Sequence, residues 1–218
     1  MPFIPKSSQI KEYQDKFIEM CKTVKGDIYA GPEYLFAPQK PYTEQQKNQI
    51  LQRFKDISEG KLIMPGTIAW TPDNQHWMNT LYAIADGEII HQYSKETDST
   101  DSHFYKDFKY GTVKEQKNTK NVFDWRDLKI GTEICRDHGH GRLKKYMEKN
   151  AINSVDMQVI LANNGTLSKK QFGIRDSGLV MLVDGTDEQT ITTLTNKQNN
   201  IIYKSDQNQN YEIHEVVL

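Results

Sequence analysis

The sequence predicts an α/β fold in which helices cover mixed β-sheets. Helical patterns alternate with short apolar runs in the first half of the chain, and hairpin-like strand pairs dominate the second half. Alternation of the two element types is typical of a sheet covered by helices, and hairpins add antiparallel strands to it. The pattern argues against an all-β barrel and against a helical bundle.

Two helices are expected near the start of the chain. Residues 8–25 place apolar side chains at helical spacing, and Gly26 ends the pattern. A second helix begins after Thr43, because Thr43 and Gln46 have the spacing of a capping box. Its apolar stripe ends near Gly60.

Strands follow these helices. Residues 27–31 form a short apolar strand, and residues 61–70 form a longer one with a bend at Pro65-Gly66. The strongest hairpin signal is Asp86-Gly87, which lies between the β-rich residues 79–85 and 88–93. Residues 96–120 are polar and irregular, so we expect a long loop there.

The second half continues with a strand pair across Arg126-Asp127, formed by residues 121–125 and 128–135. A short helix is expected at residues 141–150 and a buried strand at residues 157–162. The remaining predicted strands are short and are separated by turn signals; they lie at residues 179–183, 190–194, 201–203 and 211–217.

Composition limits the class of protein. A chain of 218 residues is expected to form one domain, residues 1–218. Its 28 basic and 29 acidic residues are mixed without a basic stripe, so nucleic acid is not an expected partner. The two cysteines make no disulfide framework, no apolar run approaches the roughly 20 residues of a membrane helix, and the N-terminus lacks a signal-peptide core. We therefore expect a cytoplasmic protein that does not enter a membrane.

Cys135 ends the apolar strand at residues 128–135 and precedes a polar elbow that contains Gly139 and Gly141. The ends of strands in open α/β sheets are where such folds place their chemistry, and the first amide N–H groups of a following helix can stabilise an oxyanion. Cys135 therefore has the position of a nucleophile. The alternative is that it only packs, as free cysteines often do.

Glu33, Lys95 and Cys135 each lie just past the end of a predicted strand. Taken singly, the glutamate and the lysine are typical of exposed loop residues. Together, the glutamate could accept the thiol proton and return it to a leaving amine, while the lysine ammonium stabilises the thiolate and the oxyanion. Such a site suits attack on an amide or nitrile carbon, which gives a thioester or thioimidate that water then resolves.

Three segments around these residues resemble the three signatures of the nitrilase (carbon–nitrogen hydrolase) superfamily. They are Gly31-Pro32-Glu33, Tyr93-Ser94-Lys95 and residues 131–137, which read Gly-Thr-Glu-Ile-Cys-Arg-Asp, and they occur in the order and at the separation of that family. Residues 62–67, the pair Asn79-Thr80 and residues 156–161 add to the likeness, which covers about residues 10–165.

The resemblance implies an α-β-β-α sandwich and hydrolysis of a non-peptide C–N bond, without a metal or a cofactor. In that scheme Glu33 is the general base, Lys95 stabilises the oxyanion and Cys135 is the nucleophile, while Asp137 braces the elbow. The expected partner is a small-molecule or side-chain amide. A homodimer is a further expectation, although the shortened second half leaves the oligomeric state open.

The chain departs from the family in two places. Many members carry a second glutamate in the loop between the lysine and the cysteine, but residues 101–111 contain none. Asp101 or His103 could take its place. Residues 167–177 are too short and too interrupted by Gly173 for the long helix that usually follows, so the sandwich is expected to be trimmed in its C-terminal half.

Six further residues are candidates for substrate binding, and each also has a simpler structural explanation. The candidates for substrate binding are Tyr34, His103, Arg136, His138, Asn163 and Asn164. The histidines could line a pocket or form local hydrogen bonds, and the asparagines could contact substrate or only form a turn. Trp70 and Trp77 are expected to pack in the core.

Cys135, His138 and His140 also permit two other interpretations. A zinc site would lack the second pair of ligands that structural zinc sites have, and a Cys–His nucleophile pair usually draws its histidine from a distant segment. A cysteine-dependent amidase is therefore the first hypothesis. A catalytically impaired relative that binds a metabolite or a protein partner is the alternative.

Overall fold

The computed structural model describes residues 7–96, 104–111, 120–186, 189–198 and 201–204. The chain divides into two compact units, an N-terminal unit, Ile4–Thr119, and a C-terminal unit that runs from Lys120. Each unit pairs a mixed β-sheet with helices, so the predicted α/β class is confirmed. The single domain expected over residues 1–218 stays a prediction. The strand predicted at residues 211–217, as well as Asp101 and His103, lies outside the described residues.

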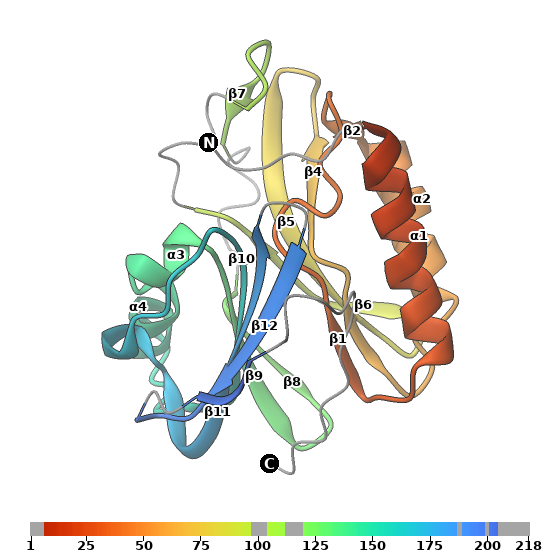
Figure 1. The fold of residues 1–218 in the computed structure, drawn as a ribbon. Coiled ribbons are helices and arrows are strands. Elements are labelled where there is room, and N and C mark those ends of the chain that lie inside the picture. Colours follow the sequence, from red (N-terminus) through yellow and green to blue (C-terminus); the bar gives the residue numbers. More distant parts are fainter. Residues whose placement is uncertain (1–6, 97–103, 112–119, 187–188, 199–200, 205–218) are drawn as a thin grey trace. The chain divides into compact units, whose positions relative to one another are not determined.

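The N-terminal unit contains two helices and a sheet in which the order β1-β3-β5-β4-β2 is extended by β6 and β7, both paired with β5. The elements are α1 (Ser7–Thr23), β1 (Ile28–Ala30), β2 (Tyr42–Thr43), α2 (Glu44–Lys55), β3 (Leu62–Met64), β4 (Thr67–Thr71), β5 (His76–Ala85), β6 (Glu88–Ser94) and β7 (Lys109–Tyr110). Both helices lie along one face of this sheet (Figure 1). Their buried side chains, among them Ile18 and Phe54, share one core with sheet residues such as Trp70.

The capping box predicted at Thr43 is confirmed at the start of α2. The Thr43 side chain accepts the Gln46 N–H, and the Gln46 side chain accepts the Thr43 N–H. The helix ends at Lys55, earlier than the predicted end near Gly60. Ser58 explains the difference, because its carbonyl and hydroxyl oxygens accept the N–H groups of Asp86 and Gly87 and so belong to the hairpin turn.

The predicted hairpin across Asp86-Gly87 is confirmed as β5 and β6, with φ values of 49° and 81° at the two turn residues. Positive φ at both positions is what the expected turn type requires. The bend at Pro65-Gly66 is also confirmed, because it separates β3 from β4. Lys95 follows β6 directly.

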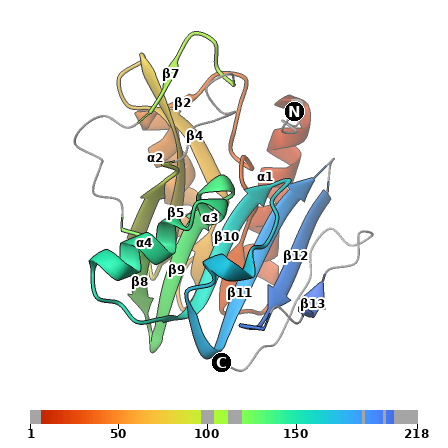
Figure 2. The same cartoon turned by 90° about the vertical axis from the view of Figure 1, so that its left-hand side faces the viewer.

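The C-terminal unit has a six-stranded sheet of order β13-β12-β11-β10-β9-β8. Its elements are β8 (Val122–Trp125), β9 (Leu128–Ile134), α3 (Arg136–Gly139), α4 (Arg142–Lys149), β10 (Val155–Asn163), the 3-10 helix η3 (Lys169–Gln171), β11 (Ile174–Thr186), β12 (Gln189–Thr195) and β13 (Ile201–Lys204). Figure 2 shows α3 and α4 lying across one face of this sheet. The short helix α3 was not predicted; it forms from the polar elbow directly after Cys135.

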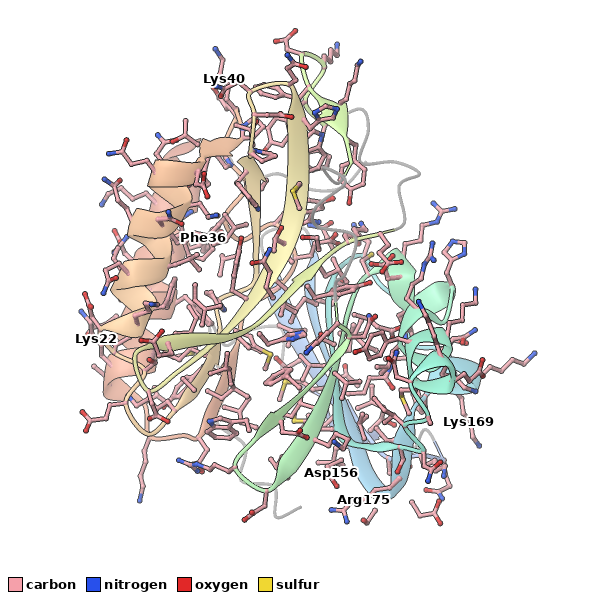
Figure 3. The ribbon with its side chains drawn as sticks, turned by 180° about the vertical axis from the view of Figure 1, so that it is seen from behind. Lys22, Phe36, Lys40, Asp156, Lys169 and Arg175 are labelled. Atoms are coloured by element: carbon pink, nitrogen blue, oxygen red, sulfur yellow. The ribbon has the colours of Figure 1, made fainter. Side chains whose placement is uncertain are left out.

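Three parallel strands, β9, β10 and β11, form the centre of this sheet. The Asp156 carboxylate fixes their starting ends, because it accepts the Lys129 N–H at 2.7 Å and pairs with Arg175 Nε at 2.7 Å (Figure 3). Between β10 and β11 the only helical element of this described stretch is η3, so the trimmed connection predicted for residues 167–177 is confirmed. The parallel arrangement brings the ends of these strands to one edge of the sheet, next to Cys135.

Within the part of the chain that the structure describes, no helix combines the length and the apolar character needed to cross a membrane.

Candidate active site

Glu33 and Lys95 meet inside the N-terminal unit. Glu33 Oε1 accepts a hydrogen bond from Lys95 Nζ at 2.8 Å and another from Asn79 Nδ2 at 2.8 Å. The exposed fractions of the two charged side chains are 1% for Glu33 and 4% for Lys95. A fully buried ion pair is costly to desolvate and is retained only where its geometry is good, so this pair is an unusual feature for two loop residues.

Backbone contacts hold the pair in place. The Lys95 N–H donates to the Asn79 carbonyl at 2.9 Å, and the Lys95 carbonyl accepts from Tyr110 Oη at 3.1 Å. On the other side, the residue after Glu33 is Tyr34, whose φ of 64° is rare for a side chain of that size. Its N–H donates to Thr67 Oγ1 at 2.8 Å, which fixes the turn that presents the glutamate.

Aromatic side chains pack together beside this ion pair. Tyr34 is buried and stacks on Phe104 with ring centroids 4.6 Å apart, and Lys95 Nζ lies 5.8 Å from the Tyr34 ring centroid. Trp77 packs edge-on against Tyr105 and is fully buried. Trp77 is therefore a core residue, as expected. The polar loop predicted at residues 96–120 contributes Phe104 and Tyr105 to this aromatic cluster.

Cys135 stands at a strained elbow of the C-terminal unit. It follows the last residue of β9 and has φ 45° and ψ −105°, a conformation that non-glycine residues rarely adopt and that clusters at functional sites. Its N–H donates to the Leu161 carbonyl at 2.8 Å, and its Sγ lies 3.8 Å from the Asn163 carbonyl oxygen. Cys135 is half-buried, and Arg136 then begins α3 with an exposed side chain.

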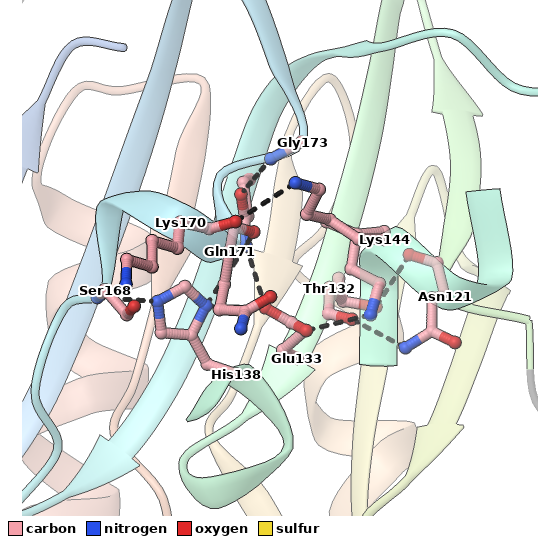
Figure 4. Close-up of polar contacts among 11 residues, drawn as sticks. Asn121, Thr132, Glu133, His138, Lys144, Ser168, Lys170, Gln171 and Gly173 are labelled. Carbon is pink, nitrogen blue, oxygen red and sulfur yellow. Dashed lines mark hydrogen bonds and ion pairs between the residues drawn. The ribbon is translucent and has the colours of Figure 1, made fainter. Parts of the chain in front are cut away.

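His138 belongs to a buried network behind that elbow (Figure 4). Its Nδ1 lies 2.8 Å from Glu133 Oε2, and its Nε2 accepts the Ser168 N–H at 3.0 Å. Glu133 also accepts from Gln158 Nε2 and from the Leu143 N–H, each at 2.8 Å. Both histidine nitrogens contact groups other than the thiol, so the geometry favours local hydrogen bonding over the Cys–His pair and over a zinc site.

Asn163 is the last residue of β10, and Asn164 begins the turn that follows it. Asn164 has φ 59°, and the Asp184 carboxylate accepts the Gly165 N–H at 3.0 Å. Burial raises the pKa of Asp184, while the backbone N–H groups of Gly165 and Asn164 oppose the shift. Asn164 therefore lies in the turn after β10, and contact of either asparagine with substrate stays a prediction.

Sequence reasoning did not single out Glu133 or Asp184, and it noted Asn79 only as part of a motif. Glu133 carried a usable signal, since a glutamate inside an otherwise apolar strand needs a buried partner.

Among the described residues, no group of three or more histidine, cysteine or acidic side chains is arranged to hold a metal ion. Glu33 and Lys95 belong to one unit and Cys135 to the other, and their meeting in one site stays a prediction.

No protein-family model and no curated protein matches this sequence. Solved structures match its fold. An amidase from Nesterenkonia sp. is 10% identical with a TM-score of 0.71, over 95% of this chain and 84% of the amidase. A member of branch 10 of the nitrilase superfamily from Saccharomyces cerevisiae is 15% identical with a TM-score of 0.66, over 95% of this chain and 83% of that protein.

A glutamine-dependent NAD+ synthetase from Acinetobacter baumannii is 14% identical with a TM-score of 0.69; the match covers 96% of this chain and 43% of the synthetase. This chain thus spans less than half the length of that enzyme. A variant of the amidase from Nesterenkonia sp. AN1, with a glutamate changed to glutamine, carries the acetamide moiety of fluoroacetamide covalently at its active-site cysteine. These likenesses establish the architecture, and the chain has the fold of the nitrilase superfamily.

Proposed function

We propose that this chain is a cysteine-dependent hydrolase that cleaves the C–N bond of a small or side-chain amide. The observation that carries the proposal is the buried ion pair of Glu33 and Lys95, with 2.8 Å between Lys95 Nζ and Glu33 Oε1. The resemblance to the nitrilase superfamily assigns these two residues the roles of general base and oxyanion-stabilising lysine. Support comes from the strained elbow at Cys135 and from a fold shared with amidases.

The proposed reaction begins with proton transfer from Cys135 Sγ to Glu33. The thiolate attacks the amide carbon, and the ammonium group of Lys95 stabilises the negative charge that develops on the carbonyl oxygen. The Arg136 N–H is the second proposed donor, because the first N–H groups of a helix have no partner within it. Glu33 then gives its proton to the nitrogen as the C–N bond breaks, which releases ammonia and leaves a thioester on Cys135.

Water resolves the thioester in the second half of the reaction. Glu33 accepts a proton from the attacking water as the new C–O bond forms, and it returns that proton to the sulfur as the C–S bond breaks, which gives the carboxylic acid, the free thiol and the original carboxylate. Asn79 supports both halves, since its Nδ2 donates to the same glutamate oxygen that accepts from Lys95. The asparagine holds the carboxylate in one orientation while the proton moves to and from it.

The test is ammonia release from a panel of small and side-chain amides. The wild type should release ammonia from at least one of them, and Cys135→Ala should release none. Glu33→Gln and Lys95→Ala should each lower kcat/KM by a factor of about 10² to 10⁴, the range for loss of a general base or an oxyanion donor. Cys21→Ala is the matched control, because Cys21 is fully buried in the core of the N-terminal unit.

Fluoroacetamide provides a second probe, because it is both an amide and an alkylating agent. Covalent addition at Cys135 of the wild type supports a competent thiol in an amide-binding site. Turnover retained in Cys135→Ala would reject the proposal. Tight binding of an amide without any ammonia release would favour the impaired, ligand-binding relative.

A further inference from the structure

His138 links the cysteine elbow to the segment Asn163–Ser168 through contacts that the proposed reaction does not use. The ring is fully buried, with Glu133 on one nitrogen and the Ser168 N–H on the other. The His138 N–H itself donates to the Cys135 carbonyl at 3.0 Å, so the histidine is part of the elbow. One side chain therefore connects the nucleophile's backbone with a loop that follows a different strand.

The contacts fix the tautomer of His138. A backbone N–H can only donate, so Nε2 must accept from Ser168 and carries no proton. The ring proton therefore lies on Nδ1 and donates to Glu133 Oε2. Two further N–H donors, Gln158 Nε2 and the Leu143 amide, hold the same carboxylate at 2.8 Å each, so it cannot turn away from the ring.

The segment that His138 holds is fastened at both ends. Its first residue, Asn163, has its carbonyl oxygen 3.8 Å from Cys135 Sγ. Near that end the buried Asp184 accepts the Gly165 N–H at 3.0 Å, and at the far end His138 accepts the Ser168 N–H. A loop held by buried side chains at two points, with one end against the sulfur, is suited to form a wall for a bound substrate.

We propose that His138 is a positioning residue that fixes the segment Asn163–Ser168 beside Cys135, and that this segment forms one wall of the site for the acyl part of the amide. The inference rests on the proposed hydrolase function. It also assigns a role to Glu133, which accepts the Nδ1 proton of His138 and so selects the tautomer in which Nε2 can accept the Ser168 N–H. Substrate affinity should then depend on the bond to Ser168 more than on the bond to Glu133.

Two substitutions separate these bonds. In His138→Gln, the amide oxygen can reach the position of Nε2 and keep an acceptor for Ser168. In His138→Asn, the shorter side chain reaches only the position of Nδ1 and keeps a donor for Glu133. Each variant removes one hydrogen bond and keeps the other. Asparagine is one methylene smaller than glutamine, so the unfolding midpoint of each variant is measured alongside to separate the loss of packing from the loss of the hydrogen bond.

Hydrogen exchange at the Ser168 amide is the first measurement, and it requires no turnover. Exchange in His138→Asn should be faster than in His138→Gln by roughly three- to tenfold, the range for loss of one hydrogen bond. Equal exchange of this amide in both variants would overturn the proposal. So would ¹⁵N spectra of the wild type that place the ring proton on Nε2, a result that does not depend on the folding of any variant.

Kinetics of amide hydrolysis is the second measurement. KM should be higher in His138→Asn than in His138→Gln by a similar factor of roughly three to ten, while the rate at which iodoacetamide modifies Cys135 should be equal in the two. Variants that differ in unfolding midpoint but not in KM would show a purely structural histidine and would reject the positioning role. If the wild type hydrolyses no amide, the proposed function fails, whereas the Ser168 exchange still decides whether His138 fixes the segment.

Discussion

The buried pair of Glu33 and Lys95 can be tested through stability, independently of any substrate. Replacing Lys95 with methionine removes the ammonium group that contacts the Glu33 carboxylate, which is 1% exposed and keeps its hydrogen bond from Asn79. Removal of one partner from a buried ion pair costs about 3–5 kcal/mol of unfolding free energy. Glu33→Gln should cost a comparable amount, because it removes the carboxylate that the buried Lys95 ammonium contacts at 2.8 Å.

The double variant Glu33→Gln/Lys95→Met contains neither charge, so its loss should be smaller than the sum of the two single losses. We expect a coupling energy between Glu33 and Lys95 of about 2–3 kcal/mol, measured by urea unfolding of the wild type and the three variants with equal m-values. The double variant should regain stability without regaining the proposed release of ammonia from amides, which separates the structural role of the pair from its proposed chemistry.

An exposed pair at the same distance provides the control. Lys129 Nζ lies 2.8 Å from Asp124 Oδ1, but the two side chains are 41% and 72% exposed. Lys129→Met should therefore change the unfolding free energy by less than about 1 kcal/mol. Single losses at Glu33 and Lys95 that add within about 0.5 kcal/mol, or a Lys95→Met variant as stable as the control, would refute the reasoning.

Three further predictions concern the thiols, an acid and two glycines. Burial raises the pKa of Cys21 to about 12, so iodoacetamide at pH 8 should modify Cys135 alone in the folded protein; labelling of Cys21 before unfolding would contradict this. Burial also raises the pKa of Asp184, so its stabilising contribution is complete below the ordinary value of about 3.9 and is lost as pH rises through the folded value. The stability of the wild type relative to Asp184→Asn should accordingly fall between pH 3 and 7 in urea unfolding, and a rise would reverse the assigned cause. Gly131→Ala should lower the free energy of unfolding by about 1–3 kcal/mol, because a Cβ there would lie 2.6 Å from a leucine carbon of α4. A Cβ at Gly139 would have no atom within 4 Å, so Gly139→Ala should leave the stability nearly unchanged. Equal effects of the two substitutions would reject the packing argument.

Local signals in the sequence predicted the elements well. The capping box at Thr43 and the turn at Asp86-Gly87 depend on residues a few positions apart, so they can be read without knowledge of the tertiary structure. The positions of Lys95 and Cys135 directly after strands were predictable for the same reason. These signals also gave the α/β class.

Contacts between distant segments could not be predicted in the same way. The partners of Glu133 include Gln158, and their meeting depends on the parallel register of β9 with β10, which no local pattern specifies. The burial of His138 could not be predicted either, because it depends on contact with the later segment that ends at Ser168. The sequence alone therefore leaves His138 as a candidate pocket residue. The helix α3 was missed since it has only four residues and its start is set by the strained backbone of Cys135.

The most direct test of the central claim is the mass of the peptide that contains Cys135, after the protein has been mixed with the amide panel and quenched in acid. We predict that one amide transfers its acyl group to Cys135 as a thioester, and that an equal amount of ammonia is released. Ammonia released without an acylated Cys135, or an acyl group found elsewhere on the chain, would contradict it.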